Sequence, residues 1–203
     1  MIIVAGFEPF RGEKVNPSML IAGEVDGRTI MGEEVRGVIL PVSYRKVKPL
    51  VESLVREEPR VLLLLGLAPR ATCVRLEAIA LNVAHSERGD EEGFKPFNQP
   101  VYEDGELAYR GTIPFNRILE SLRRAGIPSA LSFHAGTFLC NYAYYVALHN
   151  AHGTRTRVGF IHIPHLTEYA VRKPEFPSLP RELVVRAVEI VLEEALRSEE
   201  LCL

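Results

Sequence analysis

The sequence predicts an α/β fold in which a mainly parallel sheet is covered by helices on both faces. Short runs rich in leucine or β-branched residues alternate along the chain with amphipathic stretches, which is the pattern of a parallel sheet with helical crossovers. One run, Val61–Leu65, is unbroken and ends at Gly66, as expected of a strand that is buried on both faces. The chain has 203 residues and no linker-like segment, so we expect one domain over residues 1–203.

The predicted strands are short apolar runs bounded by polar or turn-forming residues. In chain order they are Ile2–Ala5, Val35–Leu40, Val61–Leu65, Val74–Val83, Ala130–Phe133 and Val158–Ile163. The predicted helices carry apolar residues at helical spacing. They are Pro17–Val25, Val47–Glu57 with Pro49 in its first turn, Ile118–Ala125, Leu139–Asn150, and Leu183–Leu196 with Ser178 as a cap. Residues 84–112 are polar and lack periodicity, which is typical of a lid, a binding loop or a contact arm.

The composition argues against several classes of function. Hydrophobic residues make up 47% and charged residues 25% of the chain, as in an ordinary soluble domain. The formal net charge is −2 and the basic residues are scattered, so we expect neither a nucleic acid nor an anionic membrane as partner. No apolar run approaches the length of a membrane span. The opening MIIVAGFEPF lacks the charged head and cleavage site of a signal peptide, so we expect a cytoplasmic location.

Metal and cofactor motifs are weak. His162 and His165 have H-x-x-H spacing, but residues three apart in a strand point to opposite faces. His149 and His152 share a helical face without a neighbouring carboxylate or cysteine. The stretch GFEPFRG has the glycine pattern of neither a dinucleotide site nor a P-loop. We therefore expect no metal and no cofactor.

Cys140 is the first candidate for chemistry. It stands in AGTFLCNYAYY, in the first turn of a predicted helix, where a thiolate is stabilised by unpaired backbone N–H groups. The alternative is a buried, inert cysteine, which is common in protein cores. The other two cysteines, Cys73 and Cys202, have no comparable setting, and an odd number of cysteines argues against a disulfide framework.

A nucleophilic thiolate needs an imidazole to protonate the leaving group. His162, at the end of a predicted strand, is placed for that role, although a lone histidine in such a strand is more often a core residue. Glu77 is a carboxylate inside the apolar run 74–83, and a buried carboxylate needs a partner such as an imidazole N–H. Together the three would form a nucleophile, a base and an orienting group.

The sequence resembles the pyrrolidone carboxyl peptidases, also called the pyroglutamyl-peptidase I family. The matching motifs are GFEPF at 6–10, Asn16-Pro17, GLA at 66–68, the strand that ends in Asn82, CNY at 140–142 and FIHIP at 160–164. The resemblance runs over nearly the whole chain. It implies a single-domain, three-layer α/β/α sandwich and a cytosolic cysteine peptidase, commonly a homotetramer without a metal, that removes N-terminal pyroglutamate from peptides.

The resemblance also implies roles for individual residues. The family's Glu–Cys–His triad falls on Glu77, Cys140 and His162, and its aromatic pocket for the lactam ring falls on Phe7 and Phe10. In such a site the Cys140 thiolate would attack the pyroglutamyl carbonyl, His162 would protonate the leaving amine, and Glu77 would orient His162. The backbone N–H of Cys140 would stabilise the oxyanion.

The chain departs from the family at two arginine positions. Ala71 occupies the first, with Arg70 one residue earlier. Glu87 occupies the second, with Arg88 one residue later. A carboxylate beside a developing oxyanion opposes catalysis, so either Arg88 supports the oxyanion or the site is altered.

These departures leave two alternatives open. One is a non-catalytic relative that binds a small acyl or peptide ligand. The other is a related thiol amidohydrolase of altered specificity that acts on a different N-acyl group. Retention of all three triad positions favours the peptidase over the first alternative.

Overall fold

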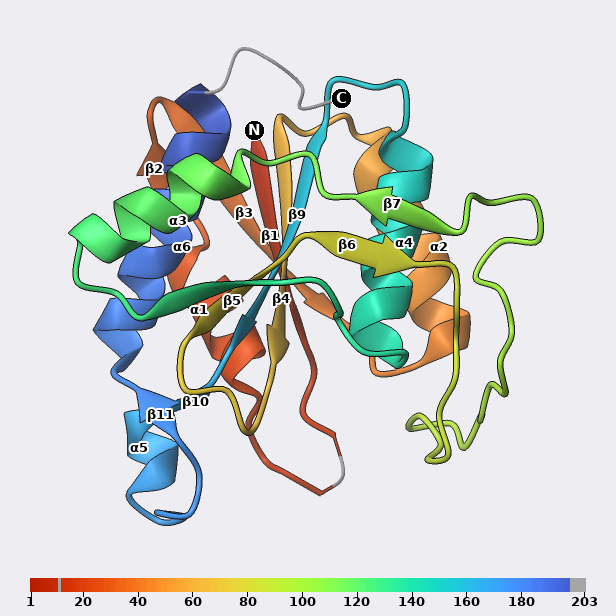
Figure 1. The fold of residues 1–203 in the computed structure, drawn as a ribbon, viewed down its shortest axis with the longest axis horizontal. Helices are drawn as coiled ribbons and strands as arrows, with labels where there is room; N and C mark the ends of the chain where they lie inside the picture. The colour runs from red at the N-terminus through yellow and green to blue at the C-terminus, as the bar shows by residue number, and fades with distance from the viewer. Residues whose placement is uncertain (11, 198–203) are drawn as a thin grey trace.

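A computed structural model describes residues 1–10 and 12–197 of the chain. Its centre is a seven-stranded sheet in the order β2-β3-β1-β4-β9-β5-β8 (Figure 1). These strands are β1 Ile2–Phe7, β2 Thr29–Ile30, β3 Glu33–Leu40, β4 Val61–Leu67, β5 Val74–Glu77, β8 Ser129–Ser132 and β9 Arg157–Ile163. Two small sheets pair β6 Ile79–Leu81 with β7 Ala108–Arg110, and β10 His165–Leu166 with β11 Ser178–Leu179. The predicted domain extends to residue 203, and its last six residues, which include Cys202, lie outside the described part.

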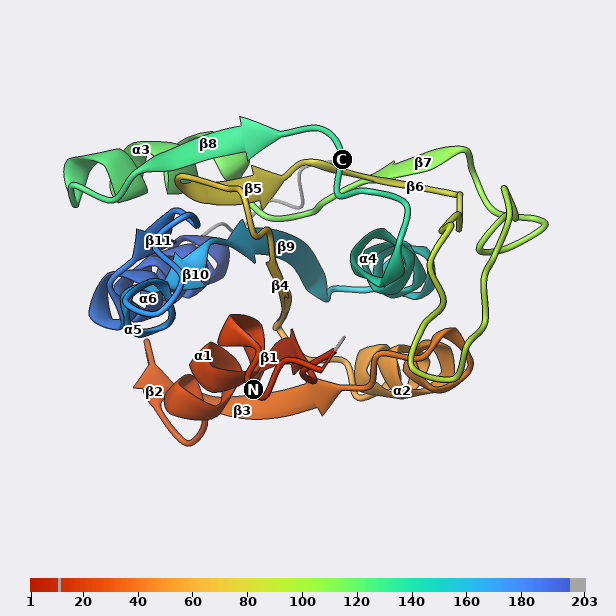
Figure 2. The same ribbon diagram turned by 90° about the horizontal axis from the view of Figure 1, so that it is seen from below.

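Helices cover both faces of the sheet (Figure 2). On one face lie α1 Pro17–Val25, α3 Phe115–Arg124 and α6 Arg181–Arg197. On the other lie α2 Tyr44–Arg56 and α4 Leu139–Ala151. A short helix, α5 Thr167–Ala170, follows β10. Each helical layer shares its own cluster of buried apolar side chains with the sheet, so the predicted three-layer α/β architecture is confirmed.

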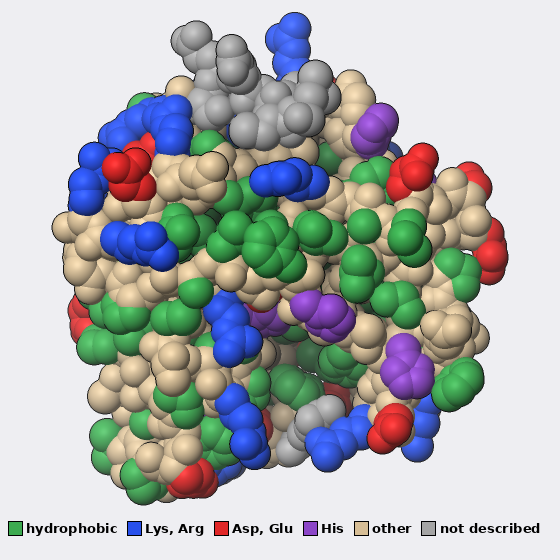
Figure 3. Space-filling model, viewed as in Figure 1, with side chains coloured by type: hydrophobic (Ala, Val, Ile, Leu, Met, Phe, Trp, Pro, Cys, Tyr) green, Lys and Arg blue, Asp and Glu red, His purple; other side chains and the backbone are tan. Residues whose placement is uncertain are grey.

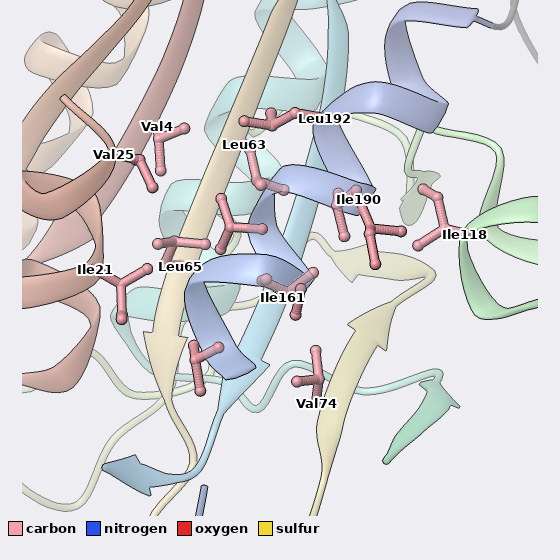
Figure 4. Close-up of a cluster of buried hydrophobic side chains, with 14 of the residues drawn as sticks. Val4, Ile21, Val25, Leu63, Leu65, Val74, Ile118, Ile161, Ile190 and Leu192 are labelled. Carbon is pink, nitrogen blue, oxygen red and sulfur yellow. The ribbon is translucent and has the colours of Figure 1, made fainter. Parts of the chain in front are cut away.

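The central strands supply side chains to both clusters in alternation. In β4, Leu63 and Leu65 pack on the α1–α6 side, as Figure 4 shows, whereas Leu62 and Leu64 pack on the α2–α4 side. All four side chains are fully buried. This double burial is the reason that the run is unbroken, and it confirms the prediction of a strand at Val61–Leu65.

The strands run in two directions. β1 pairs in parallel with β3 and β4, and β4 pairs in parallel with β9, so these four strands end at one edge of the sheet. β5 pairs antiparallel with β9 and parallel with β8, so β5 and β8 run the other way. The sheet is thus mainly parallel, as predicted, with one reversal between β9 and β5 and a second at the short edge strand β2, which pairs antiparallel with β3.

The prediction of a single strand over Val74–Val83 is wrong. It is divided at Ala78 into β5, in the main sheet, and β6, in a small sheet with β7. The Ala78 N–H still donates to Ser132 at the end of β8 (2.7 Å), but the Ala78 carbonyl accepts from Gly111 next to β7 (3.0 Å). The hydrogen-bonding partner therefore changes at this residue, and the apolar run alone does not show such a change.

Three helix starts also differ from prediction, because α2, α3 and α6 begin at Tyr44, Phe115 and Arg181 and not at Val47, Ile118 and Leu183. α2 begins at Tyr44, because Ser43 Oγ accepts a hydrogen bond from the Lys46 N–H at 3.3 Å as an N-cap. Pro49 consequently lies inside the helix and not in its first turn. Ser178 is not a helix cap, because it belongs to β11 and α6 begins at Arg181.

The long segment 84–112 is fixed to the rest of the molecule. Asp90 accepts hydrogen bonds from the backbone N–H groups of Tyr44, Glu92 and Phe94. The Tyr102 ring stacks on His149 of α4 with ring centroids 4.0 Å apart. The segment also contains β7 and an isolated bridge between residues 84 and 99. It is thus a wall of the molecule that α2 and α4 support.

Within the described residues, no helix combines the length and apolarity needed to cross a bilayer.

Gly6 lets α1 pack directly on β1. A Cβ at this position would lie 2.1 Å from the Ser18 carbonyl oxygen and 2.9 Å from Met19 N. We expect Gly6→Ala to lower the free energy of unfolding by about 1–3 kcal/mol, the usual effect of overpacking. Chemical denaturation measures it.

Gly23 is the matched control, because it lies in α1 with no atom within 4 Å of its would-be Cβ. Gly23→Ala is expected to raise stability by about 0.5–1 kcal/mol, because alanine favours the helix. Equal stability of Gly6→Ala and the unmodified chain would contradict the close approach.

Candidate active site

Glu77 and His162 form a buried pair in the middle of the molecule. Glu77 is the last residue of β5 and His162 is near the end of β9. Glu77 Oε1 and His162 Nδ1 lie 2.8 Å apart, and the two residues are 1% and 8% exposed. Because a buried carboxylate without a partner is costly, this hydrogen bond accounts for a glutamate in an apolar strand. It also leaves His162 Nε2 as the ring nitrogen for a second partner.

Cys140 is that second partner. It is the second residue of α4, where the N-cap residue Phe138 provides no side-chain hydrogen bond to the first turn. Cys140 Sγ and His162 Cδ2 would each lie 3.0 Å from a Cβ on Gly66, so the two side chains are neighbours, and the Cys140 side chain raises the pKa of His162. The structure therefore brings together the three residues that the sequence singled out, while Cys73, which is also free, lies just before β5.

Gly66 makes room for this meeting. In the parallel pairing of β4 with β9, Gly66 is the direct neighbour of His162. A Cβ on Gly66 would lie 3.0 Å from both Cys140 Sγ and His162 Cδ2, and 2.8 Å from Phe160 Cζ. A side chain at position 66 would push the Cys140 thiol and the His162 imidazole apart. Glycine at this position therefore allows the two groups to lie close together.

The surroundings favour the charged form of His162. Burial is the largest influence and lowers the pKa of the imidazole. The hydrogen bond and charge of Cys140, followed by those of Glu77, outweigh burial and raise this pKa to about 9. An imidazolium at neutral pH is the form that can donate a proton to a leaving group.

A cavity of about 260 Å³ opens at Cys140. Phe7, at the end of β1, and Phe10, in the following loop, both line it. The other lining residues are mostly apolar and come from five segments: Asn16, Val42, Leu67, Pro69, Ser86, Ala135, Phe138 and Leu139. Figure 3 shows the molecule hollowed on this side, with histidine side chains gathered beside the hollow. Its size and lining suit a small, mainly apolar group.

A larger cavity of about 440 Å³ lies between the loop before α1 and α5. Its lining includes Val15, Leu20 and Tyr169, but none of Glu77, Cys140 and His162. The smaller cavity is therefore the one that the reactive groups serve.

The aromatic loop of the pocket is anchored by Asn16 and Ser18. Asn16 caps α1 by accepting hydrogen bonds from Ser18 N–H and Oγ, at 3.0 and 2.9 Å, and its Nδ2 donates to the Glu8 carbonyl at 3.0 Å. Ser18 Oγ in turn accepts from the Phe7 N–H at 3.0 Å. The Asn-Pro motif thus holds the strand end that carries Phe7.

Asn141 is a structural residue that the sequence analysis did not single out. Its side chain is fully buried beside Cys140. It accepts from the Leu81 N–H at 2.9 Å and donates to the carbonyls of Leu81 and Val83 at 2.9 and 3.0 Å. These bonds tie the start of α4 to β6. A polar side chain inside an apolar helix is a signal for such a bond.

Asn82 was named only as a strand end, and it organises the next loop. Its side chain accepts from the N–H groups of Val101 and Tyr102 and donates to the carbonyls of Tyr102 and Gly105, over 2.7–3.1 Å. The loop that these bonds shape belongs to the wall formed by residues 84–112.

The two positions at which the resemblance leads us to expect an arginine lie in different surroundings: Glu87 is exposed, whereas Ala71 is buried. Arg88 is exposed, and the hydrogen bond that it makes runs from its backbone N–H to Ser86 Oγ at 3.2 Å. Ser86 lines the cavity, whereas Arg88 does not. Ala71 is buried and Arg70 is exposed, so an arginine at 70 does not point where a side chain at 71 points.

The histidines do not assemble into a ligand set. His162 binds Glu77, while His165 stacks on Tyr169 with ring centroids 4.2 Å apart. His149 accepts or donates a hydrogen bond with Tyr109 at 3.1 Å. In the described part of the chain, no group of three or more His, Cys, Asp or Glu residues is arranged to hold a metal ion.

Comparisons with known proteins agree on one family. Residues 1–198 match the family described as pyroglutamyl peptidase. The chain is 38% identical over 200 residues to a pyrrolidone-carboxylate peptidase of Thermococcus onnurineus, covering 97% of this chain and 99% of the relative. It is 37% identical over 202 residues to the one of Pyrococcus furiosus, covering 96% and 97%.

Solved structures give the same result. A mutant pyrrolidone carboxyl peptidase from Pyrococcus furiosus superimposes with a TM-score of 0.94 at 36% identity, covering 98% of this chain and 99% of the other. The pyrrolidone carboxyl peptidase from Thermococcus litoralis superimposes with a TM-score of 0.91 at 33% identity, covering 96% and 92%.

The raised pKa of His162 gives stability a pH dependence. A pKa raised from 6.5 to about 9 on folding contributes stability that is complete below pH 6.5 and is lost as the pH rises through about 9. We expect Cys140→Ala to lower the pKa of His162, because it removes the first of the groups that raise it. Its free energy of unfolding should therefore fall less between pH 6.5 and 9 than that of the unmodified chain.

Denaturation at both pH values, with an NMR titration of the His162 ring, provides the measurement. Cys73→Ala is the control and should keep the steeper pH dependence. An unchanged His162 titration in Cys140→Ala would show that the thiol does not act on the imidazole.

Proposed function

The chain belongs to the pyroglutamyl peptidase family, and we propose that Cys140, His162 and Glu77 are the nucleophile, the general acid–base and the orienting group of its reaction. As a member it is a cysteine peptidase that removes N-terminal pyroglutamate from peptides. The observation that carries the residue assignment is the buried Glu77–His162 hydrogen bond with the Cys140 thiol on the other side of the imidazole.

The reaction proceeds in two halves. The Cys140 thiolate attacks the pyroglutamyl carbonyl carbon, a C–S bond forms, and the carbonyl electron pair moves to oxygen. The C–N bond then breaks as the His162 imidazolium gives its proton to the leaving amine. In the second half His162 takes a proton from water, whose oxygen attacks the thioester carbon. The C–S bond then breaks, which releases pyroglutamic acid and returns the Cys140 thiolate and the His162 imidazolium. Glu77 keeps the imidazole oriented and supports its positive charge.

The oxyanion needs a hydrogen-bond donor that is fixed in advance. We assign this role to the Cys140 N–H, because it lies in the first turn of α4, where backbone N–H groups lack helical acceptors. Arg88 is the second candidate donor, because Ser86, two residues earlier, lines the cavity. Its exposed side chain would have to turn inward for this purpose.

The cavity gives the ring its place. Pyroglutamate is a small uncharged lactam, so its ring gains most from apolar contact with a few polar groups for its N–H and carbonyl. Phe7 and Phe10 line the cavity together with Cys140. Peptides with N-terminal pyroglutamate are therefore the substrates that we assign.

A non-catalytic relative that only binds an acyl or peptide ligand is not favoured. Binding alone has no need for a buried carboxylate–imidazole pair beside a thiol.

By resemblance to the family we further propose that residues 1–203 form a single domain, that the chain assembles as a homotetramer and that it works in the cytoplasm. Light scattering on the purified protein tests the tetramer, since a stable monomer would refute it.

Cys140→Ser tests the nucleophile. A serine hydroxyl is a much weaker nucleophile beside this imidazole, so we expect kcat/KM for a fluorogenic pyroglutamyl amide to fall by about 1,000-fold or more. Circular dichroism and thermal unfolding should show an intact fold.

Cys73→Ser is the matched control, a second free, half-buried cysteine that lies outside the site. It should retain the activity of the unmodified chain. Substantial hydrolysis by Cys140→Ser, or equal losses in both variants, would refute the assignment of the nucleophile.

A further inference from the structure

Arg75 is the cross-strand neighbour of His162. The antiparallel pairing of β5 with β9 sets Arg75 opposite His162 and Leu76 opposite Ile161. Directly opposed residues of an antiparallel pair put their side chains on the same face, with Cβ atoms about 5 Å apart. On the other side of His162 the neighbour is Gly66, which has no side chain. Arg75 is thus the strand neighbour of His162 that carries one.

The face on which Arg75 lies is the reactive one. Along β5, Val74 and Leu76 belong to the buried cluster on the α1–α6 side, and Figure 4 shows Val74 there with Ile161. Alternation therefore puts Arg75 and Glu77 together on the opposite face, where Glu77 binds His162. Because β5 runs against β9, Arg75 is nearer than Glu77 to the end of β9, at the edge where the Cys140 cavity is lined by the ends of β1 and β4.

Arg75 forms no ion pair within the described part of the chain. Its side chain is exposed. Within the described residues no carboxylate lies within 4.0 Å of its guanidinium, whereas Arg36, Arg60 and Arg117 each have such a partner. Its neighbour on β8 is Ala130, which is too small to cover it. The guanidinium is therefore available to a ligand.

The proposed reaction indicates which part of the substrate lies beside Arg75. If the proposed function holds, the pyroglutamyl ring occupies the cavity and the leaving amine must touch His162, which protonates it. The residue attached to that amine, the one that follows pyroglutamate, then lies outside the cavity and beside the neighbours of His162. Among these neighbours Glu77 is charged but buried, whereas Arg75 is charged and exposed.

We propose that Arg75 is a specificity-determining residue that binds a carboxylate on the residue following pyroglutamate. The carboxylate is either an acidic side chain or the free C-terminus of a pyroglutamyl dipeptide. A guanidinium presents paired donors that match the two oxygens of a carboxylate. This inference rests on the proposed function and adds to it a preferred substrate class.

The test compares kcat/KM for four substrates: the amides of pyroglutamyl-alanine, pyroglutamyl-glutamate and pyroglutamyl-lysine, and pyroglutamyl-alanine with a free carboxylate. The unmodified chain should prefer each acidic substrate to the alanine amide by about two- to fivefold, as for an exposed ion pair. The last substrate separates the terminal carboxylate from the side-chain carboxylate. The preference should shrink when salt is raised to about 0.5 M, because exposed pairs are screened.

Arg75→Gln should bring the acidic-to-neutral ratio close to one, and Arg75→Glu should shift the preference toward the lysine substrate. Arg123→Gln, which removes the same charge from the exposed side of α3, should keep the original ratio.

Hydrolysis of the alanine amide without any acidic preference, or a preference that survives in both Arg75 variants, would overturn the role of Arg75 alone. Failure of the unmodified chain to cleave any of the four substrates is a different result, which overturns the proposed function and this inference with it.

Discussion

The antiparallel pairing of β5 with β9 is the constraint on which the site depends. It is the one antiparallel pairing among the six strands from β3 to β8 in the sheet order, and it aligns β5 so that two of its residues flank His162. Glu77 reaches the imidazole from the buried side at 2.8 Å, and Arg75 lies beside it toward the open edge. If β5 ran parallel to β9, the order along the sheet would be reversed. Glu77 would then lie nearer than Arg75 to the end of β9, and Arg75 would lie deeper in the sheet. Strand direction therefore assigns the buried role to one residue and the exposed role to the other.

Three separate parts of the fold determine the position of the His162 imidazole. Glu77 comes from β5, the thiol comes from the first turn of α4, and Gly66 on β4 supplies an empty position rather than a group. The start of α4 is itself held by Asn141, whose buried side chain bonds to β6. Sheet register and one buried amide thus fix the atoms that we propose to react before any substrate arrives, which is the preorganisation that catalysis requires.

The sequence predicts well the features that depend on periodicity. The run Val61–Leu65 is buried on both faces, and α1 has the predicted limits Pro17–Val25. It does not predict features set by a partner far away in the chain. The division at Ala78 depends on Gly111, and the direction of β5 depends on a strand that follows some eighty residues later. Glu77 and His162 were found because polar groups in apolar strands need partners. Arg75 was passed over because an exposed arginine in a strand carries no such signal.

The second arginine position, at Glu87 and Arg88, lies on the exposed side of the site, unlike the first, at the buried Ala71. Glu77 and His162, which we propose as the orienting group and the general acid–base, are buried. Glu87 and Arg88 are exposed, on a segment that meets the cavity only through Ser86. A charge on the exposed rim acts through solvent and is strongly screened, so a change there weakly affects bond breaking at Cys140. It acts more directly on the part of the peptide that lies outside the cavity. Rim substitutions in this chain are therefore better understood as changes in which peptides are preferred than as loss of the reaction.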